Sequence, residues 1–399
     1  MAKDDALRQI WLLLLPCLPS EISLNTLKVA YRPGLTQAIK QAAQASDGSS
    51  NVILDIAIAC EDGSVFEYSR LQGFFGLMYR LICIVCTENQ IDIQYGNDVD
   101  ARLVLFRHTQ YLITAPAKSH FSITDLENLA KTNREWQRIF SLDGEDAESL
   151  LQDFIRLRNL SSQHTVQGAQ VERLPGGLIV RQSPTKGAMV QGNMFRRYQS
   201  VAVGGTFDHL HAGHKLLLTM TALALDSEAT EGSCITVGIT GDELLRKKKY
   251  QEELEDFFKR QSAVHFFLLG ILELMCPNHI LGETQDIKGP ESIGREVHDI
   301  LKSGLTIKYV EIFDPCGPTI TDEAISALVL SAETRSGGQA VNDKRRDKGW
   351  SPLDVLEVDV LDAGDEETSQ TDDSFRSKIS STDIRRRVQQ KSAPASEKY

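Results

Sequence analysis

The stretch VAVGGTFDHLHAGHK, residues 201–215, decides how the second half of this chain folds. A short apolar run ends in the pair Gly204-Gly205, and Lys215 begins a run of good helix formers that reaches Leu225. Glycines let the backbone turn sharply and let a ligand approach it closely. The pattern therefore predicts a strand, a phosphate-handling turn and a helix.

Two histidines stand at the predicted start of this helix. His211 and His214 flank Gly213, which has no side chain to obstruct a ligand. A helix start offers unpaired N–H groups and the positive end of a dipole, and both suit phosphate. An isolated loop histidine is usually only solvated, but the complete string is more specific than its parts. Two imidazoles and a helix end can together stabilise charge on a transferring phosphoryl group.

The stretch also carries a resemblance to a known family. Gly-Gly-Thr-Phe-Asp followed by His-x-Gly-His resembles the signature of the HxGH nucleotidyltransferase superfamily, most closely the eukaryotic-type phosphopantetheine adenylyltransferases of the monofunctional fungal kind. The resemblance covers about residues 199–390 and none of residues 1–195. It implies an α/β fold with a Rossmann-like parallel sheet in the C-terminal half. The strand-like and helix-like runs of residues 1–170 predict a separate α/β N-terminal domain before it. It also implies transfer of the adenylyl group of ATP to 4′-phosphopantetheine, giving dephospho-coenzyme A and pyrophosphate in coenzyme A biosynthesis.

A basic run follows the second predicted strand of this half, residues 234–240. The run is Arg246-Lys247-Lys248-Lys249, in an otherwise acidic chain. Strand, helix and strand imply a right-handed parallel unit, whose ligands lie at the carboxyl ends of the strands. A solvated basic segment is the alternative on charge alone. By resemblance, a lysine here bridges the phosphates of the two substrates, and we expect Lys248 to do so ahead of its neighbours.

Two later segments also resemble phosphate-binding parts of the family. Arg335 follows the predicted strand 327–331, where an arginine can hold phosphate bidentately. Residues 379–382, Ile-Ser-Ser-Thr, resemble the ISSS-type segment that holds the β- and γ-phosphates of ATP. The alternative for these hydroxyls is an ordinary N-cap of a helix that begins near Asp383.

The resemblance implies a role for each of these residues. The expected catalytic residues are His211, His214 and Lys248. The expected nucleotide-binding residues are Gly205, Thr206, Phe207, His214, Ser380, Ser381, Thr382 and Arg385, and the expected substrate-binding residues are Thr206, Lys248 and Arg335. An ionised phosphate is already nucleophilic, so no general base is expected. Mg²⁺ is expected to enter with ATP rather than on a metal site of the protein, and Asp208 is expected to stabilise the turn.

Other functions remain possible on the sequence. A cytidylyltransferase for phosphocholine or phosphoethanolamine carries Arg-Thr-x-Gly before its Ile-Ser segment, whereas residues 374–378 here are SFRSK. A nicotinate-mononucleotide adenylyltransferase is a weaker alternative. A scaffold that docks other coenzyme A enzymes through its N-terminal half is an alternative of a different class. The sequence has no Gly-x-x-x-x-Gly-Lys-Ser/Thr loop, so no kinase domain is expected.

Composition limits the cellular setting and the partners. The chain has 399 residues and a formal net charge of −12, which disfavours nucleic acid as a partner. Its seven cysteines, an odd number, fit a reducing compartment such as the cytoplasm. Cys83 and Cys86 have CxxC spacing, but they lie in an apolar run that favours core packing. No stretch reaches about 18 apolar residues, so no membrane partner is expected.

The expected domains are 1–170, an α/β domain, 171–195, a linker, 196–390, the transferase domain, and 391–399, a flexible tail. Strands are predicted at 52–59 and 101–106, whereas 71–85 could be a helix or a strand. An amphipathic helix is predicted at 122–140, with Thr124 or Asp125 near its cap. In the second half, 276–292 is expected to be a loop, 296–303 a short helix and 362–374 a mobile acidic loop.

Overall fold

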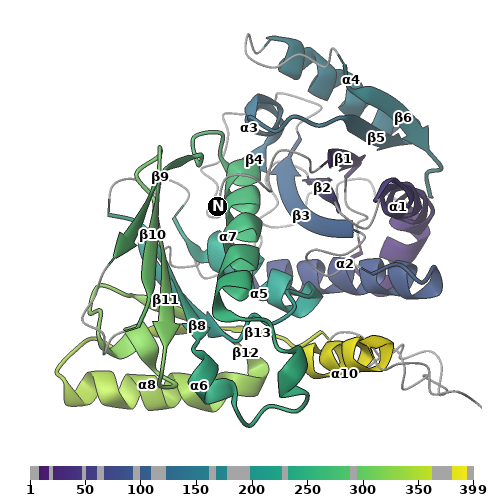
Figure 1. The fold of residues 1–399 in the computed structure, drawn as a ribbon. Helices are drawn as coiled ribbons and strands as arrows, with labels where there is room; N and C mark the ends of the chain where they lie inside the picture. The colour runs from purple at the N-terminus through teal and green to yellow at the C-terminus, as the bar shows by residue number, and fades with distance from the viewer. Residues whose placement is uncertain are drawn as a thin grey trace, which may run out of the picture. The chain divides into compact units, whose positions relative to one another are not determined.

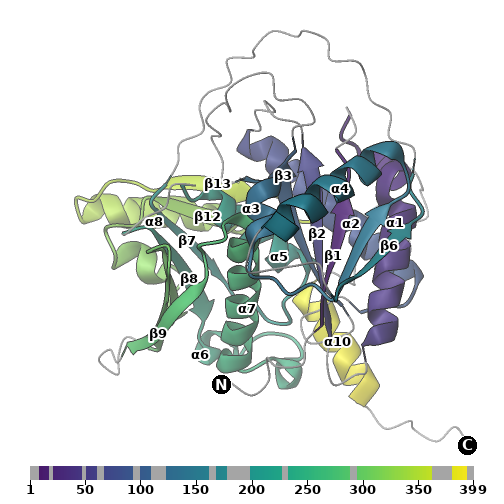
Figure 2. The same cartoon turned by 90° about the horizontal axis from the view of Figure 1, so that it is seen from above.

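The computed structural model describes residues 9–17, 21–46, 51–60, 67–92, 99–108, 123–160, 168–177, 198–226, 232–287, 294–361 and 380–392. The chain forms two compact units (Figures 1 and 2). The first comprises Met1–Arg197 with Ala222–Glu228 and Leu269–Ile280, and the second comprises the rest. The expected acidic loop and most of the expected tail lie outside the described residues.

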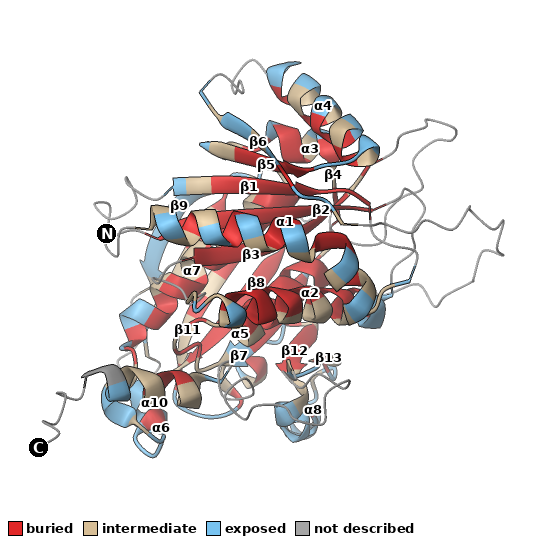
Figure 3. Ribbon diagram, turned by 90° about the vertical axis from the view of Figure 1, so that its right-hand side faces the viewer, coloured by how far each residue is buried: buried red, intermediate tan, exposed pale blue. Residues whose placement is uncertain are grey.

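The first unit is built on a parallel sheet with the strand order β4-β3-β2-β1-β5-β6. Its strands are β1 (Gln9–Leu15), β2 (Val52–Cys60), β3 (Val99–Arg107), β4 (Thr124–Asp125), β5 (Arg138–Leu142) and β6 (Gln170–Leu174). Its helices are α1 (Leu24–Ala45), α2 (Tyr68–Glu88), α3 (Leu126–Lys131) and α4 (Glu145–Leu160). The strands β1 to β3 are buried almost throughout (Figure 3), which explains why they read as continuous apolar runs.

The predicted strands of this unit are confirmed, but the predicted helix 122–140 is largely wrong. The helix α3 ends at Lys131, and residues 138–142 form β5 beside β1. The cap was correct, because the carboxylate of Asp125 accepts the backbone N–H of Asn128 at 2.7 Å. Pairing with β1 buries Ile139 and Phe140, and this long-range burial outweighs the helical pattern of the segment.

The segment 71–85, left open by the sequence, lies in the helix α2. Among the described helices, α2 alone is long and apolar enough to cross a membrane, contrary to the expectation that no stretch would be. Most of α2 is buried within the unit, so its apolar character is that of a core helix. Cys83 and Cys86 are buried in it and are not in disulfides, as core packing predicts.

The expected linker begins inside the first sheet. Residues 170–174 form β6, which pairs with β5, and Leu174 is fully buried. The backbone N–H of Gly177 donates to the carbonyl of Ala30 in α1, at 3.2 Å. The first unit therefore continues past residue 170, and residues 178–197 lie outside the described residues.

The second unit has a sheet with the strand order β13-β12-β7-β8-β11-β10-β9. Its strands are β7 (Ser200–Gly205), β8 (Cys234–Thr240), β9 (Leu281–Ile287), β10 (Glu296–Leu301), β11 (Thr306–Ile312), β12 (Ala327–Ser331) and β13 (Asp354–Val358). The helices that begin in this unit are α5 (Ala212–Ala224), α6 (Asp242–Leu245), α7 (Phe257–Met275), α8 (Arg335–Asp347) and α10 (Ser381–Ser392). The last turns of α5 and α7 belong to the first unit. The five strands from β13 to β11 are parallel, which confirms the Rossmann-like sheet.

Two expectations for residues 276–303 are wrong. The expected loop contains β9, and the expected short helix is β10, which pairs antiparallel with β9 and β11. Asp299 in β10 is fully buried and accepts hydrogen bonds from Thr284 in β9 and His265 in α7. The partners of this short segment are distant in sequence, so its local pattern did not reveal them.

The strand order reverses between β7 and β12. From β7 the chain proceeds to β8 and then β11 on one side, and it returns to β12 on the other. In open α/β sheets, ligands bind outside the carboxyl ends of strands at such a reversal. This point of the fold is where β7 leads into the turn of residues 206–211.

Candidate active site

The turn after β7 is held by hydrogen bonds to two later segments. Phe207 and His209 adopt left-handed backbone conformations, with φ of 52° and 47°. The Asp208 carboxylate accepts the backbone N–H of Glu255 at 2.9 Å and forms an ion pair with Arg385. The backbone N–H of His209 in turn donates to the Glu255 carboxylate at 2.8 Å. Asp208 therefore stabilises the turn, as predicted.

The structure brings His211 and His214 together at the start of α5. Their rings are stacked, with centroids 3.9 Å apart and planes 20° apart. Burial lowers the pKa of His214 to about 3, and burial with the nearby His214 lowers the pKa of His211 well below its usual value. Both imidazoles are therefore neutral near pH 7. Among the described residues, His214 Nδ1 is buried without a hydrogen-bond partner.

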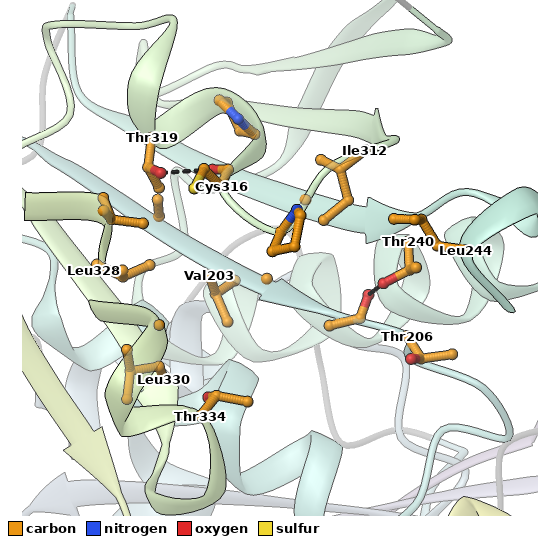
Figure 4. A pocket seen from close by; sticks show the side chains of 18 of the residues that line it. Val203, Thr206, Thr240, Leu244, Ile312, Cys316, Thr319, Leu328, Leu330 and Thr334 are labelled. Carbon is orange, nitrogen blue, oxygen red and sulfur yellow. Dashed lines mark hydrogen bonds between the residues drawn. The ribbon is translucent and has the colours of Figure 1, made fainter. Parts of the chain in front are cut away.

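A pocket of about 420 Å³ lies at the carboxyl ends of β7, β8, β11 and β12 (Figure 4). Gly205, Thr206 and Thr240 line one end of it, and Val203, Ile312, Leu328 and Leu330 are among its apolar walls. Of the three consecutive lysines 247–249, Lys248 lines the pocket. The structure therefore gathers Gly205, Thr206 and Lys248 as the sequence predicted.

Phe207 does not face the pocket, although it was expected to bind nucleotide. Its side chain is fully buried, and its ring packs against His214 with a centroid distance of 5.4 Å. A Cβ atom on Gly205 would lie 3.0 Å from the Phe207 ring. Phe207 thus packs under the turn, and a side chain at residue 205 would press on its ring.

The hydroxyls of residues 380–382 lie at the start of α10. Ser380 caps the helix, because its Oγ accepts the backbone N–H of Asp383 at 3.2 Å. Ser381 Oγ donates to the carbonyl of Asp208 at 3.1 Å and lies 3.2 Å from His211 Nε2. Ser380 is therefore the helix cap that the sequence offered as the alternative. Ser381 brings the same segment into contact with His211.

Arg385, expected to bind nucleotide, and Arg335, expected to bind substrate, both pair with carboxylates in the structure. Arg385 is 2% exposed, and its nitrogens contact Asp208, the Lys249 carbonyl and Thr382, so it anchors α10. The side chain of Arg335 is 69% exposed and forms an ion pair with Glu357 at 2.5 Å. Beyond β12, Thr334 and Gly337 line the pocket instead. The sequence does not specify where either side chain points, so it could not decide whether the guanidinium group reaches a phosphate.

Arg260 is a site residue that the sequence analysis did not assign. It is fully buried, and its Nη1 donates to the carbonyls of Thr206 and Thr240, each at 2.8 Å. Its Nη2 pairs with Asp242 at 2.7 Å. Arg260 therefore ties the carboxyl ends of β7 and β8 together. An arginine in the first turn of the helix 257–275, whose later part is mostly apolar, was the available signal.

Comparison with known proteins also separates the two halves. Residues 1–180 match a family described as a domain of unknown function (DUF8446), and residues 202–387 match the cytidylyltransferase-like family. An uncharacterized protein of Schizosaccharomyces pombe is 38% identical over 184 residues, 46% of each chain. The phosphopantetheine adenylyltransferase of Saccharomyces cerevisiae is 34% identical over 198 residues, 50% of this chain and 51% of that enzyme.

An archaeal relative is matched over more of its length. The phosphopantetheine adenylyltransferase of Methanothermobacter thermautotrophicus is 30% identical over 172 residues, which are 43% of this chain and 80% of that enzyme. The aligned part of the chain thus spans about half the length of the two yeast relatives and most of the archaeal one.

Proposed function

Because the chain belongs to the phosphopantetheine adenylyltransferase family of the nucleotidyltransferase superfamily, we propose that it transfers the adenylyl group of ATP to 4′-phosphopantetheine. The products are dephospho-coenzyme A and pyrophosphate. The observation that carries this proposal is the pair of stacked imidazoles, His211 and His214, at the start of α5. They do not line the pocket, but they follow Gly205 and Thr206, which line it together with Lys248. The apolar walls of that pocket suit the uncharged arm of phosphopantetheine.

In the proposed reaction, a phosphate oxygen of phosphopantetheine attacks the α-phosphorus of ATP. A new P–O bond forms as the bond to the bridging oxygen breaks, and pyrophosphate leaves. Lys248 neutralises and orients the attacking phosphate, and Thr206 lies where both substrates meet. His211, His214 and the positive end of the α5 dipole stabilise charge on the transferring group.

The leaving pyrophosphate is assigned to the start of α10. The N-terminal amides of a helix of 12 residues, with the hydroxyls of Ser380 and Thr382, make this end a suitable anion site, and Ser381 lies between them with its hydroxyl against His211. Arg385 holds the helix in place through its ion pair with Asp208. The carboxylates around the site, Asp208 and Asp242, are paired with arginines, so we expect Mg²⁺ to be bound through the ATP phosphates.

The test is turnover by the purified full chain. Pyrophosphate release with ATP and 4′-phosphopantetheine, together with dephospho-coenzyme A identified by mass, is the expected result. Parallel reactions with CTP and phosphocholine, and with ATP and nicotinate mononucleotide, cover the alternatives. Faster turnover in either parallel reaction would replace the proposed substrates.

Two further expectations belong to the same proposal. None of the seven cysteines, all within described residues, is in a disulfide, which suits a reducing compartment such as the cytoplasm. Docking of other coenzyme A enzymes on the N-terminal unit stays a prediction, and co-purification of those enzymes with the full chain tests it.

A further inference from the structure

The hydrogen bonds around His211 select one protonation state of its ring. Nε2 lies 3.2 Å from Ser381 Oγ, and Nδ1 accepts a hydrogen bond of 3.2 Å from the backbone N–H of Gly213. Ser381 gives its only hydroxyl proton to the carbonyl of Asp208, at 3.1 Å. The Ser381 oxygen must therefore accept from His211, so the imidazole is neutral with its proton on Nε2.

Ser381 owes its position to the anchoring of α10. The guanidinium of Arg385, one turn further along the helix, pairs with the Asp208 carboxylate and donates through Nε to the Lys249 carbonyl at 3.0 Å. Asp208 is fixed in turn by the backbone N–H of Glu255. One aspartate thus supplies the carbonyl that orients the Ser381 hydroxyl and the carboxylate that holds its helix.

The two neighbouring hydroxyls have other partners. Ser380 Oγ accepts the backbone N–H of Asp383 at 3.2 Å, as a helix cap does. Thr382 Oγ1 accepts from Arg385 at 3.3 Å. Within residues 380–382, only the Ser381 hydroxyl has a described hydrogen bond to a candidate catalytic side chain.

We propose that Ser381 is a positioning residue for His211, which holds the ring beside the start of α10 with its N–H donor at Nε2. The inference rests on the proposed function, because the donor matters only if a phosphate binds there. An arriving phosphate oxygen accepts the Nε2 proton in place of the Ser381 oxygen. The opposite tautomer would present a lone pair to the phosphate and repel it.

A double-mutant cycle in the full chain separates this role from direct phosphate binding. Ser381→Ala is expected to lower kcat between about 10- and 100-fold, with the KM for ATP unchanged. In a His211→Ala background, Ser381→Ala is expected to lower kcat no further. With His211 intact, Ser381→Thr keeps the hydroxyl and is expected to retain most of the parent activity. An equal loss from Ser381→Ala in both backgrounds would overturn the proposal. Ser23→Ala, which removes a hydroxyl from the start of α1 in the first unit, is the control for losing a serine hydroxyl at a helix start away from His211.

A second measurement does not depend on activity. In the full chain labelled with ¹⁵N-histidine, and with His211 assigned by its loss in His211→Gln, NMR at neutral pH is expected to show the proton on Nε2. Ser381→Ala is expected to shift that N–H resonance as its acceptor is lost. A proton on Nδ1, or an unshifted resonance, would contradict the inference even if the chain makes dephospho-coenzyme A. If the chain makes none, the proposed function fails and this measurement still decides the role of Ser381.

Discussion

Arg385 of α10 forms a buried ion pair with Asp208 of the turn after β7, although 177 positions separate them in the chain. The two side chains are 2% and 0% exposed. Asp208 lies in the same turn as His211, and Arg385 lies one turn after Ser381. The pair therefore joins the start of α5 and the start of α10, the two helix ends to which we assign phosphates, into one structure.

Removal of one partner from this pair is expected to destabilise the protein strongly. Arg385→Met leaves the Asp208 carboxylate buried without its cation, which costs about 3–5 kcal/mol of unfolding free energy in comparable pairs. Chemical denaturation of the full chain measures the loss. Arg386→Met is the matched control, because Arg386 is 41% exposed and its pair with Asp383 is worth at most about 1 kcal/mol. Equal losses of unfolding free energy in the two variants would show that the buried pair contributes no more to stability than the exposed one.

Lys248 is expected to be the active lysine of the basic run. Lys248→Ala removes the one cation of residues 247–249 that lines the pocket, and kcat/KM for phosphopantetheine should fall by about 100-fold. Lys247→Ala has the same charge change outside the pocket lining, so its kcat/KM should stay near that of the parent. Steady-state kinetics of both variants test this, and comparable losses would show that only the total charge of the run matters.

Gly205 and Gly204 offer a test of the close packing beneath the pocket. A Cβ atom at residue 205 would lie 3.0 Å from the Phe207 ring, whereas at residue 204 the nearest atom is 4.0 Å away. Gly205→Ala is therefore expected to cost about 1–3 kcal/mol of unfolding free energy through overpacking. Gly204→Ala should cost clearly less, and denaturation curves of the pair compare them directly. A larger loss at residue 204 would contradict the packing described here.

The lowered pKa of His214 predicts a pH dependence of stability. Burial brings this pKa from 6.5 to about 3, so between these values the unfolded chain binds a proton that the folded chain does not. The contribution to stability is complete above about pH 6.5 and is lost as the pH falls toward about 3. The parent should therefore lose more stability than His214→Gln between about pH 7 and about pH 4.5. Denaturation at both pH values measures this, and a difference between the two proteins that does not change with pH would exclude it.

The local sequence pattern was sufficient to predict much of the secondary structure of the second unit. The glycine pair, the apolar run before it and the helix formers after it predicted β7, the turn and α5 in sequence order. The carboxyl-end rule then placed residues 205, 206 and 248 together, as the pocket shows. In the first unit, the helix cap at Asp125 was predicted correctly, but the predicted helix reached residue 140 whereas α3 ends at Lys131.

The sequence by itself determined the strand–turn–helix unit, the parallel sheet and the residue types of the site, because periodicity, glycine and capping act over a few neighbouring residues. Only the tertiary structure decided that β5 and β10 are strands, since each is a short segment whose pairing partner lies far along the chain. It also decided that Arg335 points outward, that Phe207 lies beneath the turn, and that Arg260 and Arg385 are buried anchors. The direction and burial of a side chain depend on what the rest of the fold packs against it.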